Sequence, residues 1–354
     1  MTQRAQLWEG LASAGITHGS LPAEAGDRSP WYVRAMLGIA AWLAAVFLLA
    51  FLGIALSTVL RNATAAIAIG AVICGAAIVV LRMVTANVFV AQLAVAVSLA
   101  GQGLIAFGLL DHGGWRGAGP WLALAALEIV LVALAPDYLH RVLSTLAAAV
   151  AMRMALGVLG WAALFPALLA AVFVATQGNE PRLLTRSAVW TAVVTGLVLT
   201  LLFLVPASLV WNELGGVRRA SHFVALPPWL GTVALAVVFV GAIGKLLRDA
   251  RVAWTSPTGA YALLAAVAVV LVAWPIPGVM VALLVLLLAF AAGQHVLMGL
   301  AILLLLAALG HYYYSLQSTL LVKAAALFAT GVVLIAARFL VRVAVPREPE
   351  TGHA

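Results

Sequence analysis

Residues 310–338 read G-H-Y-Y-Y-S-L-Q-S-T-L-L-V-K-A-A-A-L-F-A-T-G-V-V-L-I-A-A-R, and this stretch combines the two patterns that decide the fold. Three consecutive tyrosines, Tyr312, Tyr313 and Tyr314, come first, and aromatic residues are enriched at membrane interfaces. An apolar run follows that is long enough, at about 1.5 Å per residue, to cross a hydrocarbon core of about 30 Å. The stretch therefore predicts a transmembrane helix over residues 319–341, which enters the bilayer beside an aromatic belt.

The composition of the whole chain agrees with this local pattern. Of its 354 residues, 66% are hydrophobic and only 8% are charged, and the mean hydropathy is +1.17. In a soluble domain about a quarter of the residues are charged, so the composition excludes a soluble protein. Backbone groups without hydrogen bonds are too costly in lipid, so a membrane-spanning segment is either a helix or a strand of a closed barrel. Barrel strands would alternate polar with apolar residues, and the apolar runs of this chain do not. The sequence therefore predicts an all-α fold, a polytopic transmembrane helical bundle.

Short polar loops divide the chain into about twelve predicted helices. We expect them at residues 33–57, 63–81, 86–110, 118–135, two short helices within 140–176 divided near 153–157, then 187–210, 229–247, 258–274, two within 278–314 divided near Gly293-Gln294-His295, and 319–341. The 37 residues of 140–176 are too many for one crossing and barely enough for two. A different count there would reverse the topology of the C-terminal half.

Loop charge sets the predicted orientation. Twelve crossings place both termini on one side, and thirteen of the nineteen Lys and Arg residues then fall on that side. Because cytoplasmic loops carry the excess of positive charge, the pattern predicts cytoplasmic termini and a multi-pass membrane protein.

Three regions follow from this topology. Residues 1–30 are a predicted cytoplasmic N-terminal segment with a short interfacial helix, residues 31–342 a transmembrane helical domain, and residues 343–354 a cytoplasmic tail. Trp31 and Tyr32 are predicted interfacial anchors where the chain first enters the membrane, and Tyr312 to Tyr314 are predicted anchors before the last helix. The bilayer is thus a predicted partner.

Glu128 is the candidate functional residue of the membrane interior. It lies about ten residues into its predicted span, about 15 Å deep and close to the midplane. Intramembrane carboxyl groups are costly and face a bundle interior, a partner or a water-filled path, so Glu128 is a candidate proton relay or cation ligand. The alternative is a protonated carboxyl group that hydrogen-bonds Gln92 or Gln102 and holds helices together.

Lys323 is a second candidate polar residue, and it shares a helix face with Thr319 and Thr330. Its ammonium group could bind an anionic solute or pair with Glu128. It also lies only about 6 Å inside the end of its predicted helix, at the level of the three tyrosines. At that depth Lys323 could instead extend to the outer interface as an anchor.

The chain carries no motif for a cofactor, a metal or catalysis. A metal-binding helix needs a second ligand at a spacing such as H-x-x-x-H, which none of these histidines has: His112, His222, His295 and His311. Asp137 and His140 are predicted to be polar loop ends. The net charge of +8 comes from arginines scattered between apolar runs, which indicates topology rather than nucleic-acid binding. We therefore predict a protein without cofactor, metal or enzymatic activity.

Two stretches carry a resemblance to a known family. The first is Ser29-Pro30-Trp31-Tyr32-Val33-Arg34 with the apolar run to Gly53, and the second is Tyr312-Tyr313-Tyr314-Ser315-Leu316 with Thr319-Leu320-Leu321 and Lys323. Through them the chain resembles the bacterial membrane family known as domain of unknown function 4401 over nearly its whole length. The resemblance implies a polytopic helical bundle, and with it we expect a multi-pass protein of the bacterial inner membrane. It also implies a neighbouring membrane protein of the G-D-Y-x-x-L-x-Y family as a partner, and it assigns no catalytic or binding residue.

Two functions follow as hypotheses. The first is a scaffold or interaction component of unknown molecular activity that works with a partner membrane protein. The alternative is a transporter of a small solute, an ion or protons, with Glu128 in the path. An enzyme that acts on lipid-linked substrates would need acidic or His groups near residues 211–228. A water-accessible cavity at Glu128 would favour the transporter, and a sealed bundle with a flat apolar flank would favour the scaffold.

Overall fold

The computed structural model describes residues 30–55, 62–83, 87–177, 189–201, 225–274 and 276–315, with single positions before residue 14 and between 321 and 328. Within these residues the regular structure is helical, without a strand. The labelled helices are α2 (Trp31–Ala55), α3 (Ala63–Met83), α4 (Val88–Gly113), α5 (Ala118–Leu134), α6 (Tyr138–Val158), the 3-10 helix η1 (Ala162–Leu164), α7 (Phe165–Gln177), α9 (Pro228–Asp249), α10 (Pro257–Ala273), α11 (Pro277–Ala291) and α12 (His295–Ser315). A further apolar helix spans Val189–Leu201.

Five helices of the described residues are long and apolar enough to cross a membrane. They are Ala63–Met83, Val88–Gly113, Tyr138–Val158, Pro228–Asp249 and His295–Tyr313. Shorter apolar helices accompany them, such as Ala118–Leu134 and Pro277–Ala291. The protein is therefore an all-α integral membrane protein, as predicted. The count of twelve and the cytoplasmic termini stay predictions, and the expected helix 319–341 and most of the loop 211–228 lie outside the described residues.

The region 140–176 forms two helices, but the break comes later than the predicted 153–157. Helix α6 continues to Val158, and Gly160 then adopts a positive φ of 78°. The amide of Trp161 bonds the carbonyl of Leu156 at 2.7 Å, and that of Gly160 bonds Gly157 at 3.1 Å, which closes the helix as a glycine-based C-cap. The predicted position was wrong because Arg153, which suggested a loop, lies buried within the helix.

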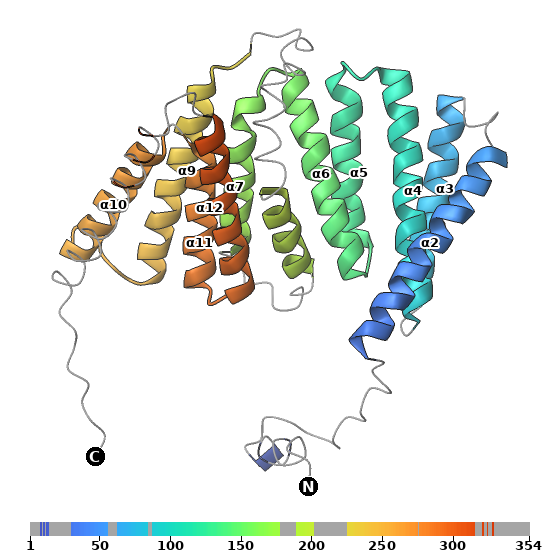
Figure 1. Ribbon diagram of the computed structural model, residues 1–354, viewed down its shortest axis with the longest axis horizontal. Coiled ribbons are helices and arrows are strands. Elements are labelled where there is room, and N and C mark those ends of the chain that lie inside the picture. Colours follow the sequence, from blue (N-terminus) through green and yellow to red (C-terminus); the bar gives the residue numbers. More distant parts are fainter. Residues whose placement is uncertain are drawn as a thin grey trace.

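The helices stand side by side, with α2 to α5 at one end of the molecule, α9 to α12 at the other, and α6 and α7 between them (Figure 1). Helices α2 and α3 both pack on α4. Glycines permit the close approach of α3 to α4, because a Cβ on Gly70 would lie 2.6 Å from the Gly101 carbonyl oxygen. The half-bundle α3 to α6 encloses the polar residues of the candidate site.

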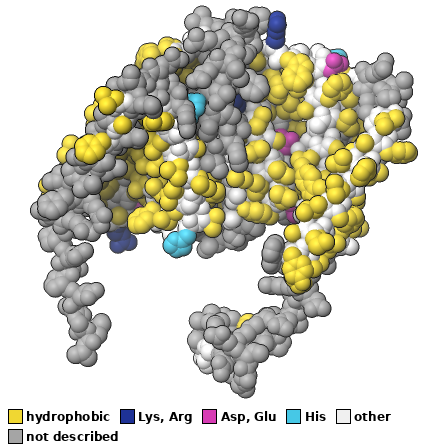
Figure 2. Space-filling view, viewed as in Figure 1, with side chains coloured by type: hydrophobic (Ala, Val, Ile, Leu, Met, Phe, Trp, Pro, Cys, Tyr) yellow, Lys and Arg dark blue, Asp and Glu magenta, His cyan; other side chains and the backbone are white. Residues whose placement is uncertain are grey.

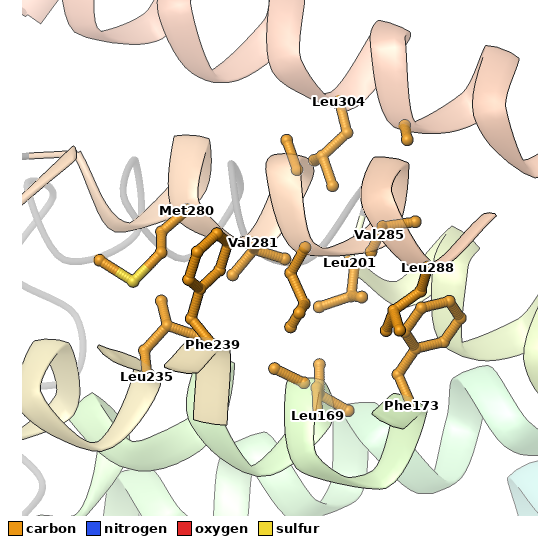
Figure 3. Packing of buried hydrophobic residues seen from close by; sticks show 14 of the residues in the cluster. Leu169, Phe173, Leu201, Leu235, Phe239, Met280, Val281, Val285, Leu288 and Leu304 are labelled. Carbon is orange, nitrogen blue, oxygen red and sulfur yellow. The ribbon is translucent and has the colours of Figure 1, made fainter. Parts of the chain in front are cut away.

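The other half-bundle has an apolar core. Figure 3 shows Phe239 of α9 near Met280 of α11 at one side of it and Phe173 of α7 near Leu288 of α11 at the other, and Leu201 contributes from the helix Val189–Leu201. Outward side chains are apolar as well, and they cover the visible face of α2 in Figure 2. An apolar exterior is the surface that lipid requires.

The predicted division into an N-terminal segment, a membrane domain and a tail stays a prediction. Trp8, Gly10, Ala12 and Ser13 are helical, and the Ser13 hydroxyl donates to the Gly10 carbonyl at 2.9 Å. The tail 343–354 lies outside the described residues.

Candidate functional site

A buried polar cluster joins four helices of the N-terminal half-bundle. Ser98, His140 and Ser144 have no exposed surface, and the other members are 4–6% exposed. Its residues are Cys74 of α3, Ser98 and Gln102 of α4, Glu128 of α5, and His140 and Ser144 of α6. We call this set the polar cluster.

His140 is the hub of the polar cluster. Its Nε2 lies 2.8 Å from the Ser98 Oγ and 3.3 Å from the amide nitrogen of Gln102, and its Nδ1 lies 3.5 Å from the Ser144 Oγ. The Cys74 Sγ lies 3.4 Å from the same Ser98 hydroxyl. Because a neutral imidazole has one donor and one acceptor nitrogen, His140 can connect the hydroxyl groups on its two sides.

Glu128 closes the other end of the polar cluster. Its carboxyl group interacts with the Ser144 side chain, while its Oε2 is buried and has no hydrogen-bond partner among the described residues. The two glutamines expected as partners bond elsewhere: Gln102 contacts Ser98 and His140, and Gln92 contacts the Trp42 indole nitrogen at 3.3 Å. That expectation was wrong: both glutamines lie on α4, whereas the Glu128 carboxyl group interacts with Ser144 of α6.

One assignment of the hydrogens makes the contacts a directed chain. The Cys74 thiol donates to Ser98, the Ser98 hydroxyl donates to His140 Nε2, and the Nδ1 hydrogen faces Ser144. The Ser144 hydroxyl group then directs its hydrogen toward the Glu128 carboxyl group, with which it interacts. The chain leads from a thiol to a carboxylate through groups that both donate and accept. Such a chain can pass a proton.

Local sequence places these side chains. Asp137 caps α6, and its Oδ1 accepts the His140 backbone amide at 2.9 Å, which fixes where His140 enters the helix. Ser144 follows His140 by four residues and Gln102 follows Ser98 by four, so each pair shares one helix face. The close packing at Gly101, where a Cβ would lie 2.9 Å from the Cys74 backbone nitrogen, brings α3 within reach.

The Ser98 and His140 pair also has the spacing of a nucleophile and its base. Ser98 is fully buried, and Cys74, His140 and Gln102 surround its hydroxyl group. A substrate carbon would need the space that these side chains fill. The geometry therefore favours proton transfer over covalent catalysis. Among the described residues no group of three His, Cys, Asp or Glu side chains is arranged to hold a metal ion.

The remaining predicted residues lie apart from the polar cluster. Tyr32 is exposed near the start of α2, and Tyr312 and Tyr313 are half-buried near the end of α12. Trp31 and Tyr314 are helical, but their side chains lie outside the description, as Lys323 does entirely. Their roles as anchors stay predictions.

Sequence reasoning missed most of the polar cluster. It identified Glu128 and Gln102, but it treated His140 as a loop end, assigned Cys74 no role, and did not consider Ser98 or Ser144. The signal that could have found them is the i, i+4 spacing of Ser98 with Gln102 and of His140 with Ser144 on two apolar helices.

Comparison with known proteins yields one finding. The family model described as domain of unknown function 4401 matches residues 30–343. Neither the curated proteins nor the solved structures contain a match.

Proposed function

The chain belongs to the family of domain of unknown function 4401, and from its polar cluster we propose a transporter of protons, alone or with an ion or small solute. Glu128 is the carboxyl group in the path. The observation that carries the proposal is the series of buried contacts from Cys74 through Ser98 and His140 to Ser144, whose side chain interacts with the Glu128 carboxyl group. Chains of acidic and His residues inside membrane helices are typical of proton relays.

Packing alone does not require these residues. The core of the other half-bundle consists of apolar side chains, such as Phe165, Leu235 and Leu284. Polar side chains there bond to backbone carbonyls: the Thr200 hydroxyl donates to the Gly196 carbonyl of its own helix at 2.7 Å, and the Lys245 ammonium group donates to the Val174 carbonyl of α7 at 3.1 Å. By contrast, the polar cluster joins side chains of different helices to one another and leaves Glu128 Oε2 unpaired among the described residues. Such groups are costly in a membrane, which supports a functional reason for them.

The proposed transfer conserves protons at every group. A proton taken up at the Cys74 end is matched by one that Ser144 delivers to the Glu128 carboxylate. His140 accepts a proton on Nε2 from Ser98 as it gives the Nδ1 proton to Ser144, so the ring stays neutral and changes tautomer. The hydroxyl groups and the imidazole then return to their first arrangement before the next proton follows.

Glu128 is placed to exchange protons near the middle of the bilayer. It follows the start of α5 by ten residues and precedes Leu134 by six, about 15 Å and about 9 Å along the helix. The unpaired Oε2 is the atom that would release the proton or contact a coupled cation. The rest of the carboxyl group stays oriented by Ser144.

Proton flux into liposomes tests the proposal. The full chain is reconstituted into vesicles with an internal pH-sensitive dye, and a potassium diffusion potential drives protons inward. We expect flux with the wild type and its loss in Glu128→Gln, which keeps the shape but cannot ionise. Asp111→Asn is the matched control, because Asp111 is an exposed carboxylate in the last turn of α4.

Infrared spectroscopy gives a readout that needs no coupled solute. Titration of the wild type should reveal the carbonyl band of a protonated carboxyl group that Glu128→Gln lacks and Asp111→Asn retains. Wild-type flux that equals that of Glu128→Gln, together with identical infrared titrations, would contradict the proposal.

A scaffold that binds a partner membrane protein is the second candidate, and a different observation favours it. An open groove on the outer side of α2 and α4 is lined by Gly38, Ile39, Trp42, Leu43, Val46 and Gln92. It is apolar apart from the Trp42 and Gln92 contact. A groove with a glycine and one polar pair suits a transmembrane helix of the G-D-Y-x-x-L-x-Y partner family.

Filling the groove tests this second candidate. Gly38→Leu places a side chain in it, whereas Gly53→Leu lies on the same helix where a Cβ would meet nothing within 4 Å. We expect the partner to co-purify with the wild type and Gly53→Leu and to be lost from Gly38→Leu. Equal recovery from all three would rule out this groove as the interface.

A further inference from the structure

Helix α6 carries polar residues on two opposite faces. His140, Ser144 and Ala151 point toward α4 and α5, where Ala151 packs in a core cluster with Leu124 and Ile105. Arg153 follows Ser144 by nine residues, about 180° around the helix. It therefore faces the other half-bundle.

Contacts of two residues that precede Arg153 on the same side of α6 agree with that direction. Four residues before it, Ala149 belongs to the apolar core of the C-terminal half-bundle. Eight residues before it, Thr145 contacts the helix Val189–Leu201, where a Cβ on Gly196 would lie 2.6 Å from the Thr145 Cβ. The guanidinium carbon of Arg153 lies 6.0 Å from the centre of the Phe165 ring.

Arg153 has no counter-ion among the described residues. The side chain is 6% exposed. Its guanidinium group lies over the ring of Phe165, which is fully buried. No salt bridge joins Arg153 to any of the four described carboxylates, which are Asp111, Glu128, Asp137 and Asp249. The nearby end of α6 does not substitute for them, because amides after the helix already bond the carbonyls of residues 155, 156 and 157.

A buried cation without an anion is unfavourable. Removal of a charged group from water is costly, and a cation–π contact offsets only part of that cost. A guanidinium that lies on an aromatic face still presents the N–H groups of its edge, which match the two oxygens of a phosphate or carboxylate. The side chain is thus held ready for an oxyanion.

We propose that Arg153 is the recognition residue of an oxyanion site between α6 and α7, separate from the polar cluster. The ligand carries a phosphate or carboxylate group, and Phe165 holds the guanidinium in place beneath it. Arg153 lies five residues before the end of α6, about 7.5 Å along the axis, and at the opposite end from His140. That depth can be reached by a soluble anion or by the phosphate of a lipid headgroup.

Thermal unfolding of the full chain in nanodiscs tests the site and separates the two sources. In one arm, inorganic phosphate is titrated at constant ionic strength into phosphatidylcholine nanodiscs. In the other, phosphatidylglycerol replaces part of the phosphatidylcholine and no phosphate is added. A saturable rise of the unfolding midpoint in the first arm identifies a soluble oxyanion, and a rise confined to the second identifies a lipid headgroup.

Arg153 variants give the decisive comparison. Arg153→Gln should weaken binding at least about tenfold, because it removes charge-assisted hydrogen bonds. Arg153→Lys keeps the charge without the paired geometry and should bind more weakly than the wild type. The control Arg116→Gln alters an exposed arginine of the α4 to α5 turn and should bind as the wild type does.

Three outcomes would overturn the site: no response in either arm, equal responses in the wild type and Arg153→Gln, or equal losses in Arg116→Gln and Arg153→Gln. If Arg153→Gln does not fold, equal affinity of Arg153→Lys and the wild type overturns it. Glu128→Gln should retain oxyanion binding, so failure of the proton path and failure of this site can be told apart.

Discussion

Ser98 of α4 and His140 of α6 lie 2.8 Å apart, Oγ to Nε2, and neither side chain has exposed surface. They are separated by 42 residues and by helix α5. A contact this short between two membrane helices is a strong link in an apolar surrounding, because no water competes for either group. Substitution of His140 can therefore distinguish its contribution to protein stability from its contribution to proton transfer.

His140→Gln should fold but lose proton flux. The amide offers a donor and an acceptor to Ser98 and Ser144, yet it cannot exchange tautomers as an imidazole does. His140→Leu should in addition destabilise the protein by at least about 2 kcal/mol, because it leaves buried hydroxyl groups unpaired. Thermal unfolding in detergent and dye-based flux measure the two effects. His295→Gln, at the exposed start of α12, is the control, and wild-type flux in His140→Gln would count against the relay.

Gly101→Ala should destabilise the protein by about 1–3 kcal/mol, since an added methyl group overpacks the contact of α3 with α4. Its Cβ would lie 2.8 Å from the Gly70 carbonyl oxygen and 2.9 Å from the Cys74 backbone nitrogen. The matched control is Gly103→Ala on the same helix, where a Cβ meets nothing within 4 Å and the helix gains propensity. Equal unfolding midpoints for the two variants would show that the helices do not approach so closely.

Asp137→Ala should cost about 1 kcal/mol of stability, because it removes the side-chain cap from the His140 amide. It should also lower proton flux, because a frayed first turn moves His140 away from Ser98. Asp249→Ala is the control: Asp249 is exposed at the C-terminal end of α9, where a negative charge opposes the helix dipole. Its stability should be unchanged or slightly higher. A neutral Asp137→Ala would mean that the cap does not position His140.

Reporter fusions test the predicted orientation. A reporter at Gly216 should report the outside of the cell, and one at the C-terminus should report the cytoplasm, because thirteen of the nineteen Lys and Arg residues then lie inside. A C-terminal reporter on the outside would mean an odd number of crossings.

The sequence by itself determined that this is a helical membrane protein, and it placed most helices within a few residues. These properties depend on local quantities: the length of an apolar run, a proline or glycine at its end, and charge in the loops. Glu128 was visible for the same reason, because a carboxyl group inside an apolar run stands out without knowledge of its neighbours.

The tertiary structure decided which polar residues meet. In the sequence, His140 lies next to a loop, and Arg153 suggested a break between two helices. Both are buried because α4 and α5 pack on one face of α6 and α7 packs on the other. Contacts such as Ser98 with His140 also require the backbones to approach at glycines that a hydropathy profile does not distinguish. Apolar runs specify that helices cross the membrane, but the crossing points of those helices bring Cys74, Ser98, His140, Ser144 and Glu128 into one chain.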